Sequence, residues 1–360
     1  MKKRLLSILV VLLIGALIVS CAPTAEVPTE EPVVDEPAGD EAMEEEPVAE
    51  DTGDLVFAHV VKSIGDTWFV RYEEGVKQFG EDFGVTAFME GPSQPDSAQQ
   101  VAVINDLIAQ GVDVLVNVPY GVPENETAQK KAMDDGTVVI GHEALTAQGD
   151  TLDYDLEAYD SCAAGEEFMR ELAAGMGEEG QYVQFVGSLT NATHNIYMEC
   201  GKAFQEANYP DMEFVGKYES NESSENGYNI MKDILKTYPE VKGVQSGDSV
   251  EVQGIGRAVD EAGLQDEITV VGVFIVSDTR ELLESGALDV SILWDPADAA
   301  YAASVVAMKI LNDEEITEGM DLGVPGYESI MIEEGENGAK VIFGSAFLKI
   351  TKDNMDDNDF

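Results

Sequence analysis

Aromatic rings and charged or amide side chains follow the apolar runs of this 360-residue sequence. In open α/β sheets, ligands bind outside the carboxyl ends of the strands. A sugar or polyol needs both kinds of group, because its C–H faces pack on rings while its hydroxyls pair with charged and amide groups. We therefore expect a sugar or polyol site formed by Lys62, Asp66, Trp68, Phe69, Asn117, His142, Glu143, His194, Asn195, Met198, Asp248, Phe274, Trp294 and Asp295.

Three charged residues of this set are expected to form a polar clamp on the ligand hydroxyls. Lys62 and Glu143 follow strands of one half of the chain, and Asp248 follows a strand of the other half. A charged group bonded to a hydroxyl contributes about 1.5–3 kcal/mol. We therefore expect each of the three to matter for affinity.

Structural interpretations of several of these residues stay open. Lys62 can be a solvated lysine at a strand end, Trp68 and Phe69 can belong to the apolar stripe of a helix, and His142 can be a buried structural histidine. Two of the three histidines follow strands, which also permits a metal site. No tight ligand spacing supports one, so we expect no metal.

Sequence motifs for catalysis and cofactor binding are largely missing. There is no Walker-type glycine loop, no strand followed by GxGxxG, no GxSxG and no CxxC. No histidine pair has zinc-helix spacing. We therefore expect a protein that is not an enzyme and has no cofactor. An exported hydrolase using Glu143 and Asp295 remains an alternative.

The elements that must position these residues alternate between apolar runs and helical stripes. In the first half of the folded part, strands are expected at 55–61, 85–89, 112–118 and 138–141, and helices at 67–83, 98–110 and 128–135. The second half restarts the pattern, with strands at 182–187, 213–218, 241–246, 268–274 and 290–294, and helices at 161–176, 196–208, 226–238, 250–262, 278–286 and 297–311. The predicted fold class is α/β, with two doubly wound parallel-sheet lobes.

The first 53 residues are expected to be a targeting signal followed by a tether. Lys2, Lys3 and Arg4 precede a fifteen-residue apolar run from Leu5 to Val19, and the run leads to Cys21. This order resembles a bacterial lipobox, so we expect a signal peptide at 1–20 and a lipid on Cys21. A plain anchor helix is the alternative. Residues 22–53 hold twelve acids, five prolines and no lysine or arginine, which predicts a disordered tether over 21–53.

The charge balance excludes some partners. The chain has 71 acidic and 20 basic residues, for a formal charge of −51. Nucleic acids and anionic membrane surfaces need a basic face, so neither is an expected partner of the protein surface. Three cysteines exclude a disulfide-dense scaffold, and the sequence leaves open whether Cys162 and Cys200 pair.

Several segments together resemble the type I periplasmic binding proteins of sugar ABC importers, in the branch with rhamnose-binding and autoinducer-2-binding proteins. The segments are 61–69 (VKSIGDTWF), 91–93 (GPS) with Asp96 and Gln99, 106–113 (DLIAQGVD), 270–272 (VVG), 293–295 (LWD) and the terminal Asp359-Phe360. The resemblance covers about 54–360. It implies two lobes joined by a hinge of three chain crossings, with lobe one at 54–158 plus 295–327 and lobe two at 159–294 plus 328–360.

The resemblance also implies a function and a place of action. A monomeric lipoprotein outside the cytoplasm would close on a sugar or polyol and deliver it to the membrane permease of an ABC importer. A sensor that reports a sugar or an autoinducer-2-type signal is the alternative. His194 stands where autoinducer-binding relatives have a carboxylate, Gly247-Asp248-Ser249 replaces their proline-aspartate-alanine, and Glu143 replaces an aspartate. We therefore expect a ligand other than autoinducer-2.

Overall fold

The computed structural model describes residues 55–360. The expected signal peptide, the lipid-carrying Cys21 and the acidic tether lie outside this range. No helix of the described range is long and apolar enough to cross a membrane.

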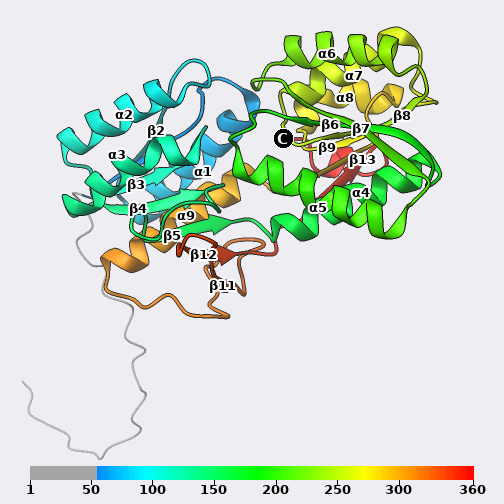
Figure 1. Ribbon diagram of the computed structural model, residues 1–360. Helices are drawn as coiled ribbons and strands as arrows, with labels where there is room; N and C mark the ends of the chain where they lie inside the picture. Colours follow the sequence, from blue (N-terminus) through cyan, green and yellow to red (C-terminus); the bar gives the residue numbers. More distant parts are fainter. Residues whose placement is uncertain (1–54) are drawn as a thin grey trace, which may run out of the picture. The chain divides into compact units, whose positions relative to one another are not determined.

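Lobe one is built on a seven-stranded sheet with the order β11-β12-β5-β4-β3-β1-β2 (Figure 1). Its strands pair in parallel except for the antiparallel pair β11–β12. The strands are β1 (Val56–Val60), β2 (Thr86–Glu90), β3 (Val114–Asn117), β4 (Val138–His142), β5 (Tyr154–Glu157), β11 (Met331–Glu334) and β12 (Lys340–Phe343). The helices are α1 (Thr67–Phe83), α2 (Ser97–Gln110), α3 (Val122–Asp134) and α9 (Pro296–Leu311).

Helices cover both faces of this sheet because its central strands are apolar on both sides. In β1, Phe57 joins the core on the side of α1 and α9, while Ala58 and Val60 join the core on the side of α2 and α3. Gly75 of α1 lies against the backbone of Ala297 in α9, where a Cβ would overlap the carbonyl group. Strand β1 is therefore packed on both faces, and on one face the two covering helices are in close backbone contact.

Lobe two is built on a six-stranded sheet with the order β13-β10-β9-β8-β6-β7. Only the edge strand β13 is antiparallel to its neighbour. The strands are β6 (Gly180–Val186), β7 (Met212–Glu219), β8 (Val241–Ser246), β9 (Thr269–Gly272), β10 (Val290–Leu293) and β13 (Leu348–Thr351). The helices are α4 (Ser161–Met176), α5 (Ala192–Asn208), α6 (Ser224–Thr237), α7 (Glu251–Ala262) and α8 (Val276–Ser285). Figure 1 shows α4 and α5 on one face and α6, α7 and α8 on the other.

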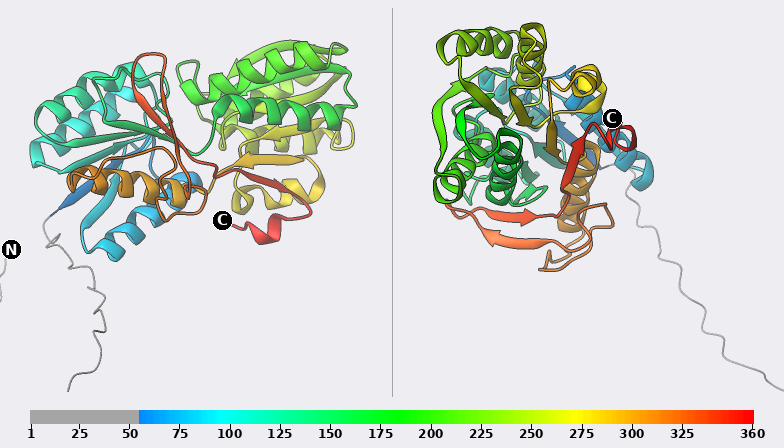
Figure 2. Two further views of the ribbon diagram at one scale, coloured as in Figure 1. Left: turned by 90° about the horizontal axis from the view of Figure 1, so that it is seen from below. Right: turned by 90° about the vertical axis from the view of Figure 1, so that its right-hand side faces the viewer.

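The chain passes between the two sheets three times, after β5, after β10 and after β12. Figure 2 shows the red C-terminal segment making the last passage. Our expectation that residues 328–360 all belong to lobe two is wrong for the first part of this segment. Strand β12 pairs in parallel with β5, with Val341 opposite Asp155, and β11 pairs with β12. Backbone hydrogen bonds therefore place residues 331–343 in lobe one.

The predicted helices and buried strands are confirmed in number and order up to β4 and from α4 to α9, with ends shifted by a few residues. Helix α3 begins at Val122, six residues before the expected start, because Pro123 fits the first turn of a helix. The four-residue strands β5, β11, β12 and β13 were not predicted.

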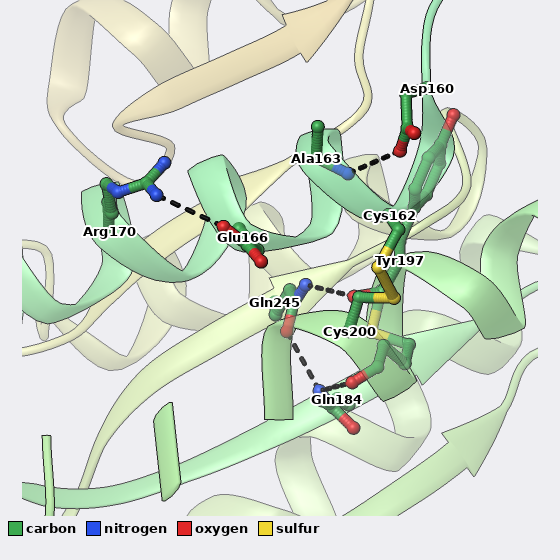
Figure 3. The surroundings of a disulfide bond; sticks show 10 residues. Asp160, Cys162, Ala163, Glu166, Arg170, Gln184, Tyr197, Cys200 and Gln245 are labelled. Carbon is green, nitrogen blue, oxygen red and sulfur yellow. Dashed lines mark hydrogen bonds and ion pairs between the residues drawn. A yellow bond between two sulfur atoms is a disulfide. The ribbon is translucent and has the colours of Figure 1, made fainter. Parts of the chain in front are cut away.

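A disulfide joins Cys162 of α4 to Cys200 of α5, which answers the question that the sequence left open. The two Cα atoms lie 5.2 Å apart. Figure 3 shows the bridge beside Gln184 and Gln245, whose side chains hydrogen-bond to each other and to the α5 carbonyl groups of Met198 and Tyr197. Helix α5 is thus fixed by a covalent bond and by buried amides.

Candidate functional site

A small cavity, with a free volume of about 30 Å³, lies at the carboxyl ends of the strands and is lined by both lobes. We call it the interlobe cavity. Lobe one contributes Lys62, Asp66, Trp68, Phe69 and Glu143, and lobe two contributes His194, Tyr197, Glu222, Gly247, Asp248, Ser249, Val250, Val273 and Trp294. Its mixture of rings and polar groups is typical of a small-molecule site.

Lys62 is the charge centre of the cavity. Its Nζ atom lies 2.5 Å from Glu143 Oε2 and 4.0 Å from Glu222 Oε1, and its side chain is 5% exposed. Burial opposes the charge, but Glu143 and Glu222 outweigh it and raise the pKa of Lys62. Burial raises the pKa of Glu143, but Lys62 and His142 outweigh it, so the pKa lies below its usual range. The Lys62–Glu143 pair is therefore ionised.

Two cavity carboxylates of lobe two lack such a close cation. Burial raises the pKa of Glu222 to about 8, with Lys62 opposing the shift and Asp248 adding to it. Burial likewise raises the pKa of Asp248 to about 6, although the N–H groups of Glu251 and Val250 donate to Asp248 Oδ1 at 2.9 and 3.1 Å.

Glu143 and Glu222 share an unusual backbone conformation. Their φ angles are 59° and 50°, in the left-handed region that non-glycine residues seldom adopt. Such strain persists only where the surroundings impose it, and it gathers at functional sites. Gly187 makes room for Glu222, because a Cβ at this glycine would lie 2.6 Å from Glu222 Cγ.

His194 has a fixed tautomer. Its Nδ1 atom accepts a hydrogen bond from the Gly187 N–H at 3.3 Å, so the proton of the neutral ring is on Nε2. Burial and Lys62 lower the pKa of His194 to about 3, and the ring is therefore neutral. Its Nε2–H is a donor for a ligand oxygen.

The aromatic part of the cavity is built from Trp68 of lobe one and Trp294 at the end of β10. Their rings meet edge to face, with centroids 5.0 Å apart. His142 and Tyr159 also pack edge to face on Trp294. Trp294 Nε1 is buried without a hydrogen-bond partner.

Eight of the fourteen expected site residues line the interlobe cavity: Lys62, Asp66, Trp68, Phe69, Glu143, His194, Asp248 and Trp294. Asp66 also caps α1, where its two oxygens accept from the Phe69 N–H and the Ser63 hydroxyl. Whether each residue contacts ligand stays a prediction.

The other six expected residues lie outside the cavity lining. Asn117 accepts from Gln100, and Asn195 donates to the carbonyls of Ser188 and Asn191. Met198 and Phe274 are fully buried in the core. The two asparagine side chains therefore bond to other protein groups, and the Met198 and Phe274 side chains pack in the hydrophobic core.

His142 and Asp295 complete this set of six. His142 Nδ1 bonds to the Leu156 carbonyl at 2.6 Å. Asp295 caps α9 and binds the Arg71 guanidinium through both oxygens. The hydrolase alternative needs Glu143 and Asp295 in one site, but only Glu143 lines the cavity.

Sequence reasoning singled out neither Tyr197 nor Glu222. Glu222 follows β7, so the strand-end rule applied to every expected strand would have found it. Tyr197 lies one helical turn after His194 on α5 and shares its face. Val250 and Val273 were also missed, because apolar side chains carry no signal of ligand binding.

One group of described residues could hold a metal ion by proximity, since ligand atoms of His194, Glu222 and Asp248 lie within 4.8 Å of one another. The chemistry fits poorly. The Gly187 N–H occupies His194 Nδ1, which leaves a protonated Nε2 and no free lone pair. The Lys62 ammonium group, 4.0 Å from Glu222, would also repel a cation held there.

Two α/β lobes with a polar and aromatic cavity between them are the arrangement of a solute-binding protein. Residues 57–315 match the periplasmic binding protein domain, and the chain belongs to this family. This match and the two-lobed structure confirm the predicted family and the predicted fold. Proteins of this family act outside the cytoplasm.

Curated relatives of the chain are sugar import proteins. The D-apiose import binding protein of Actinobacillus succinogenes is 26% identical over 263 residues, which are 71% of this chain and 82% of the relative. The ribose import binding protein RbsB of Salmonella typhimurium is 24% identical over 270 residues, which are 75% of this chain and 88% of the relative.

Solved structures share the fold. A solute-binding protein from Clostridium phytofermentas with bound L-rhamnose has a TM-score of 0.78 at 18% identity, over 85% of this chain and 98% of that one. LsrB from Clostridium saccharobutylicum in complex with AI-2 has a TM-score of 0.78 at 19% identity, over 85% of this chain and all of that one.

Proposed function

We propose that this protein captures a sugar or polyol between its lobes and delivers it to the permease of an ABC importer. The observation that carries the proposal is the interlobe cavity, in which buried charged groups and two tryptophan rings from both lobes surround one space. The relatives named for ribose and D-apiose import support the ligand class and the importer.

We also propose that the protein binds its ligand without chemical turnover and is held at the outer face of the cell membrane by a lipid on Cys21. The first statement is supported by relatives that are binding proteins. The second rests on the lipobox-like sequence around Cys21. Cys21→Ser should leave an unprocessed precursor without lipid label, and normal labelling of this variant would refute the anchor.

A thermal-shift screen against pentoses, hexoses, deoxysugars and polyols tests the capture of a sugar. A ligand present at a hundred times its dissociation constant should stabilise the protein by about 2.7 kcal/mol. The hit should be recovered unchanged after long incubation with the protein. A panel without any hit would contradict the proposed ligand class, and a changed ligand would contradict binding without turnover.

A further inference from the structure

We propose that the captured sugar or polyol carries a protonated amine, which binds between Glu222 and Asp248 of lobe two. This inference rests on the proposed function and narrows its ligand class to amino sugars and amino polyols.

The first argument is the charge of the interlobe cavity. Four carboxylates line it, from Asp66, Glu143, Glu222 and Asp248, and among the lining residues Lys62 is the one lysine or arginine. Glu143 holds Lys62 at 2.5 Å. With a neutral sugar, each remaining carboxylate would either hold a proton or stay enclosed without a matching positive charge, and the charged form is costly in a desolvated site.

The second argument is an unused acceptor that is independent of the charge count. The Glu222 side chain is 5% exposed, and its Oε1 atom is buried without a hydrogen-bond partner. Asp248 uses Oδ1 for the N–H groups of Val250 and Glu251, while none of the described hydrogen bonds involves Oδ2. Glu222 Oε1 thus has the Lys62 ammonium 4.0 Å away but accepts no hydrogen bond, and Asp248 Oδ2 is free to accept one.

An ammonium group fits this pair of acceptors. An ammonium nitrogen that donates at about 2.8 Å to two oxygens, along tetrahedral directions, needs them about 4.6 Å apart. One ligand atom from each of Glu222, Asp248 and His194 lies within 4.8 Å of the other two, so an oxygen of each carboxylate is near enough for one nitrogen to reach both. The Nε2–H of His194 is a donor, so it suits an oxygen near the amine rather than the amine itself. The geometry points to an amine with a neighbouring hydroxyl.

The raised pKa values of the two carboxylates agree with this inference. With a pKa of about 8, Glu222 carries a proton near neutral pH when no ligand is present. A cationic ligand would replace that proton as the balancing charge. A metal ion would offer the same charge, but His194 has no free lone pair to ligate it. The Lys62 ammonium group opposes either cation, so the binding of an amine depends on both carboxylates.

Matched pairs of ligands test the inference by calorimetric titration of the full chain. The pairs are glucose and glucosamine, galactose and galactosamine, mannose and mannosamine, and sorbitol and 1-amino-1-deoxysorbitol. For at least one pair, the amine should bind at least about tenfold more tightly, which corresponds to about 1.4 kcal/mol. Glu222→Gln should abolish this preference, and the matched control Glu225→Gln should keep it, because Glu225 lies on α6 at the surface beside Arg257.

Each titration is repeated with EDTA and with added Ca²⁺ or Zn²⁺. A neutral sugar that binds as tightly as its amine would overturn the inference and leave the proposed function intact. Binding of the neutral sugar only with added metal would overturn it in favour of a metal site. If no sugar of either kind binds, both the inference and the proposed function fail.

Discussion

Lys62 is held between two glutamates that reach it from different lobes. Glu143 comes from lobe one and Glu222 from lobe two, and both have the strained left-handed backbone. One lysine therefore links ligand affinity to the contact between the lobes, since a ligand that replaces Glu222 as its partner changes that contact.

Glu143→Gln should weaken ligand binding about ten- to a hundredfold, because a charged acceptor becomes a neutral one. The sequence alone predicts that Glu143→Ala keeps the melting temperature of the empty protein nearly constant or raises it, because charges in an empty site support little packing. The structure changes that expectation, since loss of one partner leaves Lys62 buried with a more distant counter-charge. The melting temperature of the empty protein should therefore fall.

Titration calorimetry and a melting curve on the same variant test both effects. Glu166→Gln is the control, because Glu166 pairs with Arg170 on the exposed side of α4. Unchanged affinity with a lowered melting temperature would remove Glu143 from the site.

Glu222→Gln should stabilise the empty protein at pH 8. Burial raises the pKa of Glu222 to about 8 from its ordinary value of 4.5. The folded state then holds this proton more tightly than the unfolded state, so the stability that it contributes is present below about pH 4.5 and is lost as pH rises to about 8. The titratable groups that face Glu222 are Lys62, Asp248, Glu143, Asp66, Glu251, His194 and Tyr120.

Glutamine is neutral throughout this range and should remove the loss. We expect the free energy of unfolding to rise by about 1–3 kcal/mol at pH 8 and to change little at pH 4. Chemical denaturation of both proteins at the two pH values measures the difference. An equal effect at both would show that the proton on Glu222 is irrelevant.

The site could be predicted from the sequence where a polar residue follows a strongly apolar strand. Lys62 and Asp248 are such residues, and both line the cavity. Asn117 also follows a buried strand, yet its side chain contacts Gln100, because strand ends place a residue near the edge without fixing its direction. Glu222 was not predicted, because β7 is only partly buried and its sequence is not a strongly apolar run that would mark the residues after it.

At the scale of elements, α5 connects the core of lobe two to the cavity. It carries His194 and Tyr197 in the cavity lining and Cys200 in the disulfide. Asn191 caps its first turn by accepting from the His194 N–H at 2.9 Å. The position of this helix thus sets two cavity residues at once.

Replacing both Cys162 and Cys200 by serine should lower the free energy of unfolding by about 2–4 kcal/mol. The bond closes a loop between residues 38 positions apart, and removing it gives the unfolded chain more freedom. Ligand affinity of the folded variant should stay the same, since Gln184 and Gln245 still hold α5. Urea unfolding and calorimetry test the two parts, and an equal stability of both proteins would contradict a structural role of the bond.

The elements that sequence reasoning missed are short or polar. Strand β11 has the sequence Met-Ile-Glu-Glu and is mostly exposed, so no alternation of four residues distinguishes it from a loop. Strand β5 has the sequence Tyr-Asp-Leu-Glu, and its two carboxylates, Asp155 and Glu157, are not typical of a buried strand. Their pairing is decided by neighbours distant in the sequence. Helices such as α1, with a complete apolar stripe, needed no such information.

At the scale of the whole molecule, the lobes meet through few direct bonds beside the cavity. The Thr67 hydroxyl at the start of α1 donates to Asp278 of α8 at 2.7 Å. The Arg71 guanidinium lies 5.2 Å from the ring centre of Phe360. Exposed polar contacts of this kind contribute little, so ligand binding can decide between open and closed forms.

Ligand binding should change tryptophan fluorescence, because the chain has two tryptophans and both line the cavity. Closure removes water from the indole rings, which shifts intensity and wavelength. Titration of a confirmed ligand measures the change, and Trp68→Phe and Trp294→Phe assign it to each ring. An unchanged spectrum with bound ligand would mean that the environment of these rings does not respond to binding.

The pairing of β12 with β5 has a consequence for the order in which the protein is made. A ribosome releases the strands β1 to β5 early, but residues 340–343, which add β12 beside β5 in the same sheet, come almost last. Lobe one cannot finish its sheet while synthesis is under way. For a protein that acts outside the cytoplasm, the newly made chain thus stays incompletely folded until nearly all of it is available for transport.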